Sequence, residues 1–403
     1  MDSYGFPSTN RLINADSSPS RYGEDRSVRD LRFLNFLKAI NPSSSPILKL
    51  DSESFARLTT REVRELDTLA IAGLPVLYRI EVYLSLTQFV EGVSSVGEDV
   101  EIVASSGVQD AINRDLDRTF PGHEYFEEET SQDNLRQILV LFAALNPSIG
   151  YCQGLNFIAG LFLLLTRNIA QSTHLLNVFV NEIMPEGYYS EKMEGQVSDS
   201  GDEAKITRTE ATIIQFSNGF PSHSNSRTHF FMIHSSQYID GLVFEHLARE
   251  LFPKVYEKLK VQLGFDFAVS TFNWFATGFV NVFKDTESCF RVWDVCFIRK
   301  DGRFIMRVAL ALLGIMEKDI LKCRERKEAE DLFSQITRKV DIDELVSLAA
   351  RPSLRGSLFR RGPELDQEIF QLRTHYREKC VQAGMWVDDN DDDDDDNEEE
   401  EAK

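Results

Sequence analysis

The 403-residue sequence has few of the features that mark secreted, metal-binding or membrane proteins. Its five cysteines are an odd number with no C-x-x-C spacing, which argues against a disulfide framework and a structural zinc site. Its most apolar run, Leu155 to Leu165, is far shorter than the roughly 20 residues that span a bilayer. The N-terminal residues lack the apolar core of a secretory signal. We therefore expect a soluble, cytoplasmic protein without a transmembrane segment.

Motifs of self-sufficient enzymes are absent as well. The sequence contains neither G-x-x-x-x-G-K-[ST] nor G-x-G-x-x-G, the glycine-rich loops that cradle phosphates. It also lacks the zinc-binding H-E-x-x-H and the nucleophile elbow G-x-S-x-G. We therefore expect that the chain alone binds no nucleotide, cofactor or metal.

Positive charge is also scarce, and the formal net charge is −21. Residues 388–403 hold twelve carboxylates against one lysine, so this tail carries −11 and the other 387 residues carry about −10. A run of like charges at that density cannot collapse, and we expect a disordered tail. The acidic body repels phosphate backbones, which excludes nucleic acid and anionic membranes as direct partners.

Apolar residues recur with helical spacing along most of the chain. Between Asn134 and Leu145 they fall on one helical face, with Asp133 as the expected N-cap and Asn146-Pro147 at the end. Similar patterns predict helices over residues 242–263 with a break near Pro253, 272–283, 290–298 and 304–320. No run of alternating apolar and polar residues is long enough for a sheet. We predict an all-α fold.

One candidate site is the stretch Ile112-Asn-Arg-Asp115-Leu-Asp-Arg118, which Thr119-Phe-Pro121 follows. On a helix Asp115 and Arg118 are i,i+3 neighbours, so the carboxylate can steer the guanidinium, while Ile112 anchors the same face. Pro121 then ends the element and leaves Arg118 near a helix terminus, where a long side chain can project. On these residues alone, the pattern is more typical of a surface ion pair.

A second candidate site is Asn146-Pro-Ser-Ile-Gly150-Tyr151-Cys152-Gln153-Gly154, which opens the apolar run. Gly150 and Gly154 permit a tight turn that holds Gln153 at the mouth of a helix. The carboxamide of glutamine can both donate to and accept from a water molecule. Seen alone, the stretch is also an ordinary turn between helices.

Cys152 invites a third interpretation, an independent hydrolase in which a distant histidine such as His174 activates the thiol. No histidine or asparagine motif accompanies the cysteine. A small buried thiol is the simpler interpretation.

The two stretches together, in this order and spacing, resemble the catalytic motifs of the TBC-domain family, helical proteins that activate Rab-type GTPases. The resemblance extends over further blocks from Gly73 to Leu313: Gly73-Leu-Pro75 with Arg79, Arg118-Thr-Phe-Pro121-Gly-His123, Tyr188-Tyr189 with Met193-Glu-Gly195, Trp274-Phe275, Arg291-Val-Trp293-Asp294 and Ala309-Leu-Ala-Leu-Leu313. Several blocks in the family's order favour this resemblance over the two simpler interpretations.

The resemblance implies that Arg118 and Gln153 are catalytic residues inserted in trans into a GTP-bound Rab-type GTPase. Ile112, Asp115, Tyr151, Gly150 and Gly154 are then supporting residues. GTP and Mg²⁺ would belong to the partner, so the chain would be a GTPase activator and not an enzyme with its own active site. Recruitment to endomembranes would be peripheral and through the GTPase. The alternative is a non-catalytic scaffold of the same fold that binds Rab GTPases or effectors.

Composition and the resemblance together divide the chain. We expect a flexible arm over residues 1–29, a helical lead-in over 30–72, a TBC domain over 73–320, a C-terminal helical extension over 321–386 and the acidic tail over 387–403. The polar residues 198–237 separate segments that look contiguous in the family, and are either a regulated disordered loop or translated intron sequence. Tyr83 also departs from the family, which usually has tryptophan at this position of its first motif, four residues after the arginine.

Overall fold

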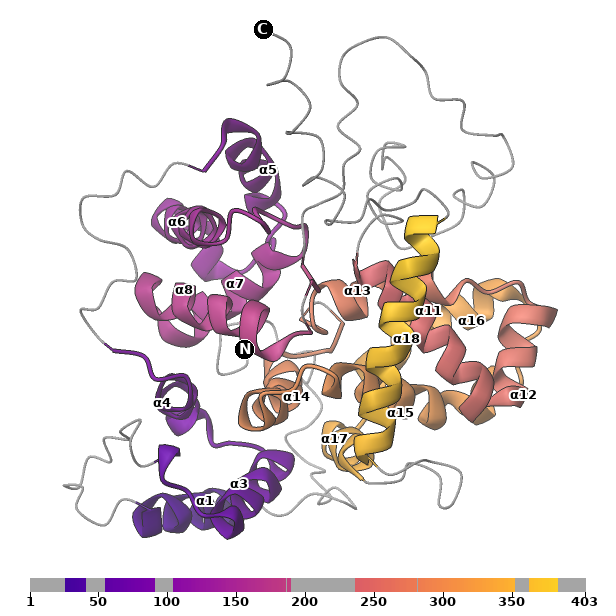
Figure 1. Ribbon diagram of the computed structural model, residues 1–403, viewed down its shortest axis with the longest axis horizontal. Coiled ribbons are helices and arrows are strands. Elements are labelled where there is room, and N and C mark those ends of the chain that lie inside the picture. The colour runs from indigo at the N-terminus through magenta and orange to yellow at the C-terminus, as the bar shows by residue number, and fades with distance from the viewer. Residues whose placement is uncertain are drawn as a thin grey trace, which may run out of the picture.

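The computed structural model describes residues 26–40, 55–90, 104–185, 187–189, 236–280, 282–351 and 362–382. Every regular element in these ranges is a helix, which confirms the predicted all-α fold (Figure 1). The expected N-terminal arm up to residue 25, residues 198–235 of the expected insert and the acidic tail lie outside the described residues. No helix in the described ranges is both long enough and apolar enough to cross a membrane.

The first half of the chain forms an N-terminal lobe, which is indigo to magenta in Figure 1. Its helices are α1 (Arg26–Ile40), α3 (Thr60–Ala72), α4 (Val76–Leu86), α5 (Ser106–Leu116), η1 (Glu124–Glu127), α6 (Glu129–Leu145), α7 (Leu155–Thr166), α8 (Ile169–Val178) and the π-helix η2 (Phe179–Ile183).

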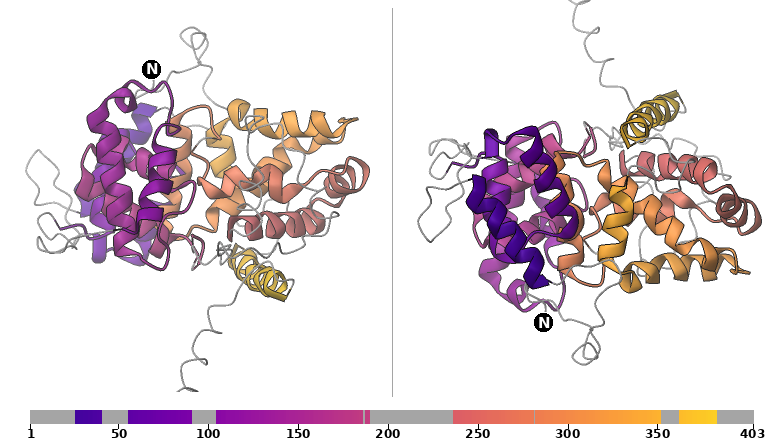
Figure 2. Two further views of the ribbon diagram at one scale, coloured as in Figure 1. Left: turned by 90° about the horizontal axis from the view of Figure 1, so that it is seen from above. Right: turned by 90° about the horizontal axis from the view of Figure 1, so that it is seen from below.

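The second half forms a C-terminal lobe, and a last helix lies outside both lobes (Figure 2). The lobe contains α11 (Ser236–Leu251), α12 (Pro253–Tyr256), the π-helix η4 (Glu257–Gln262), α13 (Phe267–Ala276), α14 (Thr286–Arg299), α15 (Phe304–Ile320), α16 (Arg326–Lys339) and α17 (Ile342–Ala350). The last helix, α18 (Gly362–Gln382), packs on α11.

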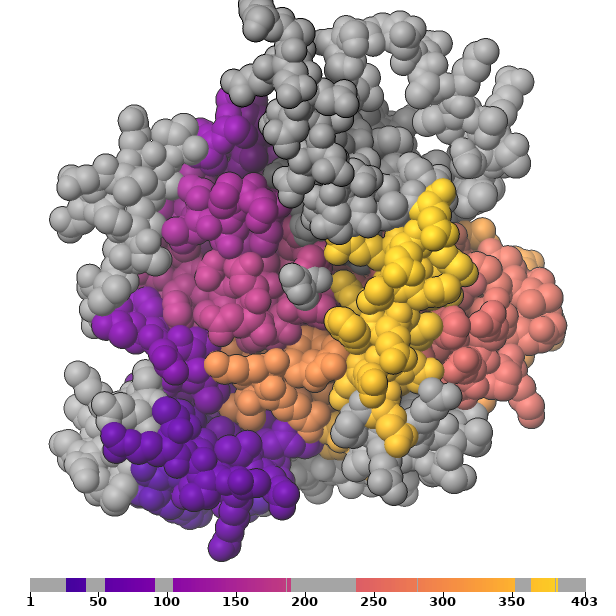
Figure 3. All heavy atoms as spheres, viewed as in Figure 1, coloured from indigo at the N-terminus to yellow at the C-terminus, as the bar shows by residue number. Residues whose placement is uncertain are grey.

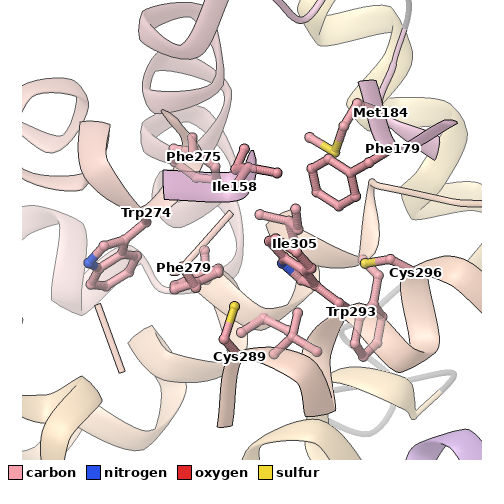
Figure 4. Packing of buried hydrophobic residues seen from close by; sticks show 14 of the residues in the cluster. Ile158, Phe179, Met184, Trp274, Phe275, Phe279, Cys289, Trp293, Cys296 and Ile305 are labelled. Carbon is pink, nitrogen blue, oxygen red and sulfur yellow. The ribbon is translucent and has the colours of Figure 1, made fainter. Parts of the chain in front are cut away.

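The core runs through both lobes without interruption. Figure 4 shows side chains of α7, η2, α13, α14 and α15 meeting there, among them Ile158, Phe179 and Trp293. Trp293 is fully buried, its ring lies 4.7 Å from that of Phe179, and its indole nitrogen donates to the Gly278 carbonyl at 2.9 Å. Burial of whole aromatic side chains at this junction stabilises the packing of the two lobes.

A buried ion-pair network fixes the stretch from Gly73 to Arg79 against α14. Arg79 is fully buried, and its guanidinium donates to Asp294 at 2.8 Å and to Glu287 at 2.9 Å. Asp294 also accepts from the Leu74 backbone nitrogen at 3.1 Å. A buried charge is tolerated only when it is paired in this way.

Tyr83, which departs from the pattern of the family that the sequence resembles, completes this network. Its hydroxyl donates to Asp294 at 2.8 Å, and its fully buried ring stacks on Phe297 with centroids 4.0 Å apart. The tyrosine therefore supplies both apolar area and one more donor to the buried carboxylate.

Several predicted helix ends differ from the structure. The helix expected from Asn134 begins at Glu129, so Asp133 is not its N-cap; it lies inside α6 and pairs with Arg136. The helix expected over 272–283 is wrong in its second half, because α13 ends at Ala276 and the following backbone has positive φ at Gly278 and Phe279.

Other ends lie close to the expected boundaries. Pro253 does break the predicted 242–263 helix, as the first residue of α12. Helix α11 begins at Ser236, so the last two residues expected in the polar insert are helical. Helix α1 begins at Arg26, inside the expected arm.

Candidate functional site

Helix α5 carries the first candidate stretch and ends just before Arg118. Ser105 caps the helix by accepting from the Val108 backbone nitrogen, and Ile112 is fully buried and anchors one face. Asp115 lies on the same face and is only 4% exposed, whereas the Arg118 side chain is 51% exposed. The two side chains form an ion pair. The Arg118 side chain thus projects from the surface, while the Asp115 carboxylate that pairs with it is buried in the core.

Tyr151 joins this pair to the second candidate stretch. Its hydroxyl donates to Asp115 Oδ2 at 2.6 Å, while Arg118 pairs with Oδ1. Burial raises the pKa of Asp115, and the bonds from Tyr151 and Arg118 oppose that rise. Burial also raises the pKa of Tyr151 well above its ordinary value, so the phenol keeps its proton and remains a donor. The two stretches are therefore connected through one carboxylate.

A second connection runs through residues that the sequence did not single out. Thr119 donates to the Asp115 carbonyl at 2.7 Å and accepts from the Asn156 side chain at 2.8 Å. Asn156 in turn accepts from the Gly154 backbone nitrogen at 3.2 Å. Asn156 is fully buried, and it is the one side chain with hydrogen-bonding groups in the apolar run Leu155 to Leu165. A single amide in such a run is the signal that could have identified it.

The turn that carries Gln153 depends on its two glycines. Gly150 has φ 58° and Gly154 has φ 107°, a conformation that side chains disfavour. A Cβ on Gly154 would also lie 2.6 Å from the Ala276 carbonyl oxygen. Gln153 itself is half-buried, and no side-chain hydrogen bond ties its carboxamide to any other described residue. The glycine conformations thus define the turn, and the Gln153 carboxamide has no side-chain hydrogen bond within the described part of the chain.

Cys152 and His174, the residues of the hydrolase alternative, each have a polar contact with another residue. The half-buried Cys152 thiol donates to the Tyr189 carbonyl at 3.2 Å, and the His174 ring lies 2.9 Å from the Thr87 hydroxyl. These contacts commit Cys152 and His174 to partners other than each other, which does not support the pair named for the hydrolase alternative. The described ranges also contain no group of three or more His, Cys, Asp or Glu side chains that could hold a metal ion.

A family model of the Rab-GTPase-TBC domain matches residues 95–201 and 219–321, which together are more than half of the chain. The chain belongs to the Rab-GTPase-TBC domain family. The two matched segments of this TBC domain are separated by residues 202–218, inside the expected polar insert, and the first segment contains both Arg118 and Gln153.

Curated relatives are consistent with the family. This chain is 27% identical over 374 residues to TBC1 domain family member 2A of Rattus norvegicus, covering 88% of this chain and 34% of that protein. It is 30% identical over 234 residues to growth hormone-regulated TBC protein 1 of Homo sapiens, covering 57% of this chain and 56% of that protein. The chain thus covers between about a third and just over half of the length of these relatives.

Among solved structures, the crystal structure of the Chlamydomonas flagellar RabGAP TBC domain has the same fold. It superimposes with a TM-score of 0.57 and 19% sequence identity, covering 87% of this chain and 98% of that chain.

Proposed function

We propose that this TBC domain is a GTPase-activating protein for a Rab-type small GTPase in its GTP-bound state, and that Arg118 and Gln153 act in trans on the bound GTP. The observation that carries the proposal is the hydrogen bond between Tyr151 and Asp115, which joins the arginine stretch to the glutamine turn. Family membership supplies the partner class.

The arginine suits the charge that develops in GTP hydrolysis. Phosphoryl transfer spreads negative charge over the equatorial oxygens, and a planar guanidinium stabilises it through paired hydrogen bonds. The Asp115 carboxylate orients Arg118 without neutralising it fully, because the guanidinium is half-exposed and can reach a visiting protein.

The glutamine suits the second task, which is to hold the attacking water. Its carboxamide can accept from and donate to the same water molecule. An amide that already forms hydrogen bonds within the described site would bind a water molecule poorly, and the Gln153 carboxamide forms no such bond with the described residues. The backbone nitrogens of Gly150 and Gly154 donate to the Asn146 carbonyl at 2.8 Å and to the Asn156 side chain at 3.2 Å, and these bonds order the turn before the partner arrives. GTP and Mg²⁺ belong to the partner in this mechanism.

Single-turnover GTP hydrolysis by a panel of Rab proteins, with and without the purified chain, tests the proposal. Arg118→Ala should remove about 10³- to 10⁵-fold of the stimulation, the range known for arginine fingers. Arg118→Lys should be nearly as poor, because an ammonium cannot form the paired hydrogen bonds. Gln153→Ala should lower kcat more than it raises KM. Arg114→Ala is the matched control, since it removes an exposed arginine that lies within α5, shortly before Arg118.

The panel also separates activation from scaffolding. A chain that binds a GTP-bound Rab without accelerating hydrolysis would be the non-catalytic scaffold, and the roles given to Arg118 and Gln153 would be wrong. Parent-like stimulation by both the Arg118→Ala and Gln153→Ala variants would contradict the roles while leaving activation itself in place. As an activator the protein would act in the cytoplasm and reach endomembranes peripherally, through the GTPase.

A further inference from the structure

The turn formed by Gly187, Tyr188 and Tyr189 lies against the glutamine turn and holds it on both sides of Gln153. The Tyr189 carbonyl accepts from the Cys152 thiol at 3.2 Å. The Tyr189 hydroxyl donates to the Ala276 carbonyl at 3.4 Å, and this carbonyl oxygen lies only 2.6 Å from the place that a Cβ on Gly154 would occupy. Tyr189 therefore contacts one neighbour of Gln153 directly and the other through Ala276.

Tyr188 fixes this turn in the C-terminal lobe. Its side chain is buried, and its hydroxyl donates to the Phe275 carbonyl at 3.1 Å. Its own carbonyl accepts from the Gln237 side chain at 2.6 Å, at the start of α11. The turn is thus held by α11 and α13, and whatever shifts Tyr188 also shifts Tyr189.

Helix α18 contacts the same turn from the outer surface of the molecule. Arg373 places its guanidinium 4.9 Å from the centre of the Tyr188 ring and forms an ion pair with the buried Asp240 of α11. Arg377, one helical turn later, lies 3.3 Å from the position of a Cβ on Gly187. In Figure 3, α18 crosses the face of the molecule where the two lobes meet. Two arginines of one helix therefore face the Gly187–Tyr189 turn.

This helix lies beyond the segments that match the family model, which end at residue 321. We propose that Arg373 is a positioning residue for Gln153: by pairing with Asp240 and covering Tyr188, it holds the Gly187–Tyr189 turn against Cys152 and Gly154. This inference rests on the proposed role of Gln153. A C-terminal helix outside the family core would then tune the activity of the glutamine turn.

The ion pair between Arg373 and Asp240 connects α18 to α11, so a change at Arg373 can reach the Gly187–Tyr189 turn. The Asp240 side chain is only 4% exposed, and its Oδ2 atom has no hydrogen-bond partner in the described part of the chain. Loss of Arg373 leaves this carboxylate buried without its cation, which forces α11 and the adjoining turn to rearrange. Because that loss can also prevent folding, the double variant Asp240→Asn/Arg373→Gln removes both charges together and leaves no unpaired ion.

The rate at which iodoacetamide alkylates Cys152, followed by peptide mass spectrometry, measures the position of the glutamine turn without any GTPase. The other four cysteines are buried, so the signal from Cys152 is separable. Arg373→Gln and the double variant should accelerate alkylation about fivefold, the factor expected from losing one hydrogen bond of ordinary strength. The same variants should lower kcat in the Rab assay by a similar factor and leave KM unchanged.

Asp366→Asn is the matched control. It breaks the ion pair with Arg307 (2.9 Å) that fastens the beginning of α18 to α15, about two helical turns before Arg373. Alkylation and kcat should remain at parent values. Equal effects of Asp366→Asn and Arg373→Gln would overturn the inference, because general undocking of α18 would then be the cause. Unchanged alkylation in folded Arg373 variants would overturn it as well. Absence of stimulation by the parent chain would refute the proposed function alone, since the alkylation comparison does not depend on it.

Discussion

Tyr151→Phe isolates the link between the two candidate stretches, because it removes one hydroxyl and leaves the ring in the core. The lost bond is the 2.6 Å donation to Asp115 Oδ2. A hydrogen bond to a charged group contributes about 1.5–3 kcal/mol, so we expect the free energy of unfolding to fall by about that amount. Asp115 would retain Arg118 as its partner, but its carboxylate would be free to turn.

The effect on activation has an upper limit set by the arginine side chain. Freeing a well-ordered arginine restores at most about 2 kcal/mol of rotamer entropy, which corresponds to about 30-fold in rate. Removing the guanidinium itself should cost about 10³- to 10⁵-fold. We therefore expect Tyr151→Phe to reduce single-turnover stimulation by up to about 30-fold, clearly less than Arg118→Ala.

The assay pairs urea unfolding with single-turnover hydrolysis at a temperature where the variant is folded. Tyr78→Phe on α4 is the matched control, because no described residue bonds to the Tyr78 hydroxyl and the same atom is removed. A loss as large as that of Arg118→Ala would refute the reasoning, since Tyr151 would then do more than orient Arg118. Parent-like activity in a folded variant would show that the GTPase, not Asp115, orders the arginine.

Three further predictions concern stability. Gly154→Ala should destabilise the fold by about 1–3 kcal/mol, because the residue has positive φ and its Cβ would clash with a backbone carbonyl. Gly107→Ala, at an open helical position, should not destabilise the fold. Thermal unfolding of the two variants measures the difference. Tyr83→Phe should lower the free energy of unfolding in urea by about 1.5–3 kcal/mol, because Asp294 loses a buried donor. Burial raises the pKa of Asp115, so its carboxyl stabilises the fold fully below the unfolded-state pKa and loses that contribution as the pH rises through the folded-state pKa. The stability advantage of the parent over Asp115→Asn should therefore shrink from acid toward neutral pH in urea titrations, and an advantage that grows with pH would contradict this sign.

Much of the fold could be predicted from the sequence because its helices bury continuous apolar faces. Helix α15 begins and ends at the predicted Phe304 and Ile320. The conformation of the stretch after Ala276 could not be predicted, because its aromatic residues have helical spacing while its backbone adopts positive φ at Gly278 and Phe279. Composition reports which side chains are buried, but backbone dihedrals in a packed turn depend on tertiary contacts.

The candidate site was predictable in part for a similar reason. Asp115 and Arg118 are close in sequence, so their ion pair follows from helical spacing. The bond from Tyr151 to Asp115 spans 36 positions, and spacing alone cannot supply it. Resemblance to a family placed the two stretches together as a hypothesis, but it did not indicate which atoms join them. The roles of Arg118 and Gln153 remain predictions.

The position of Asp115 explains why one acidic residue can serve two separate stretches. A carboxylate has two oxygens, and here each faces a different element: Oδ1 faces the exposed arginine, and Oδ2 faces the buried phenol of the glutamine turn. An exposed carboxylate would be solvated by water and would orient neither donor strongly. Burial removes that competition, and the two donors offset part of the cost of keeping the charge, although the pKa of Asp115 stays raised by burial. The arginine can therefore be both exposed to a partner and fixed in direction, since its anchor is part of the core.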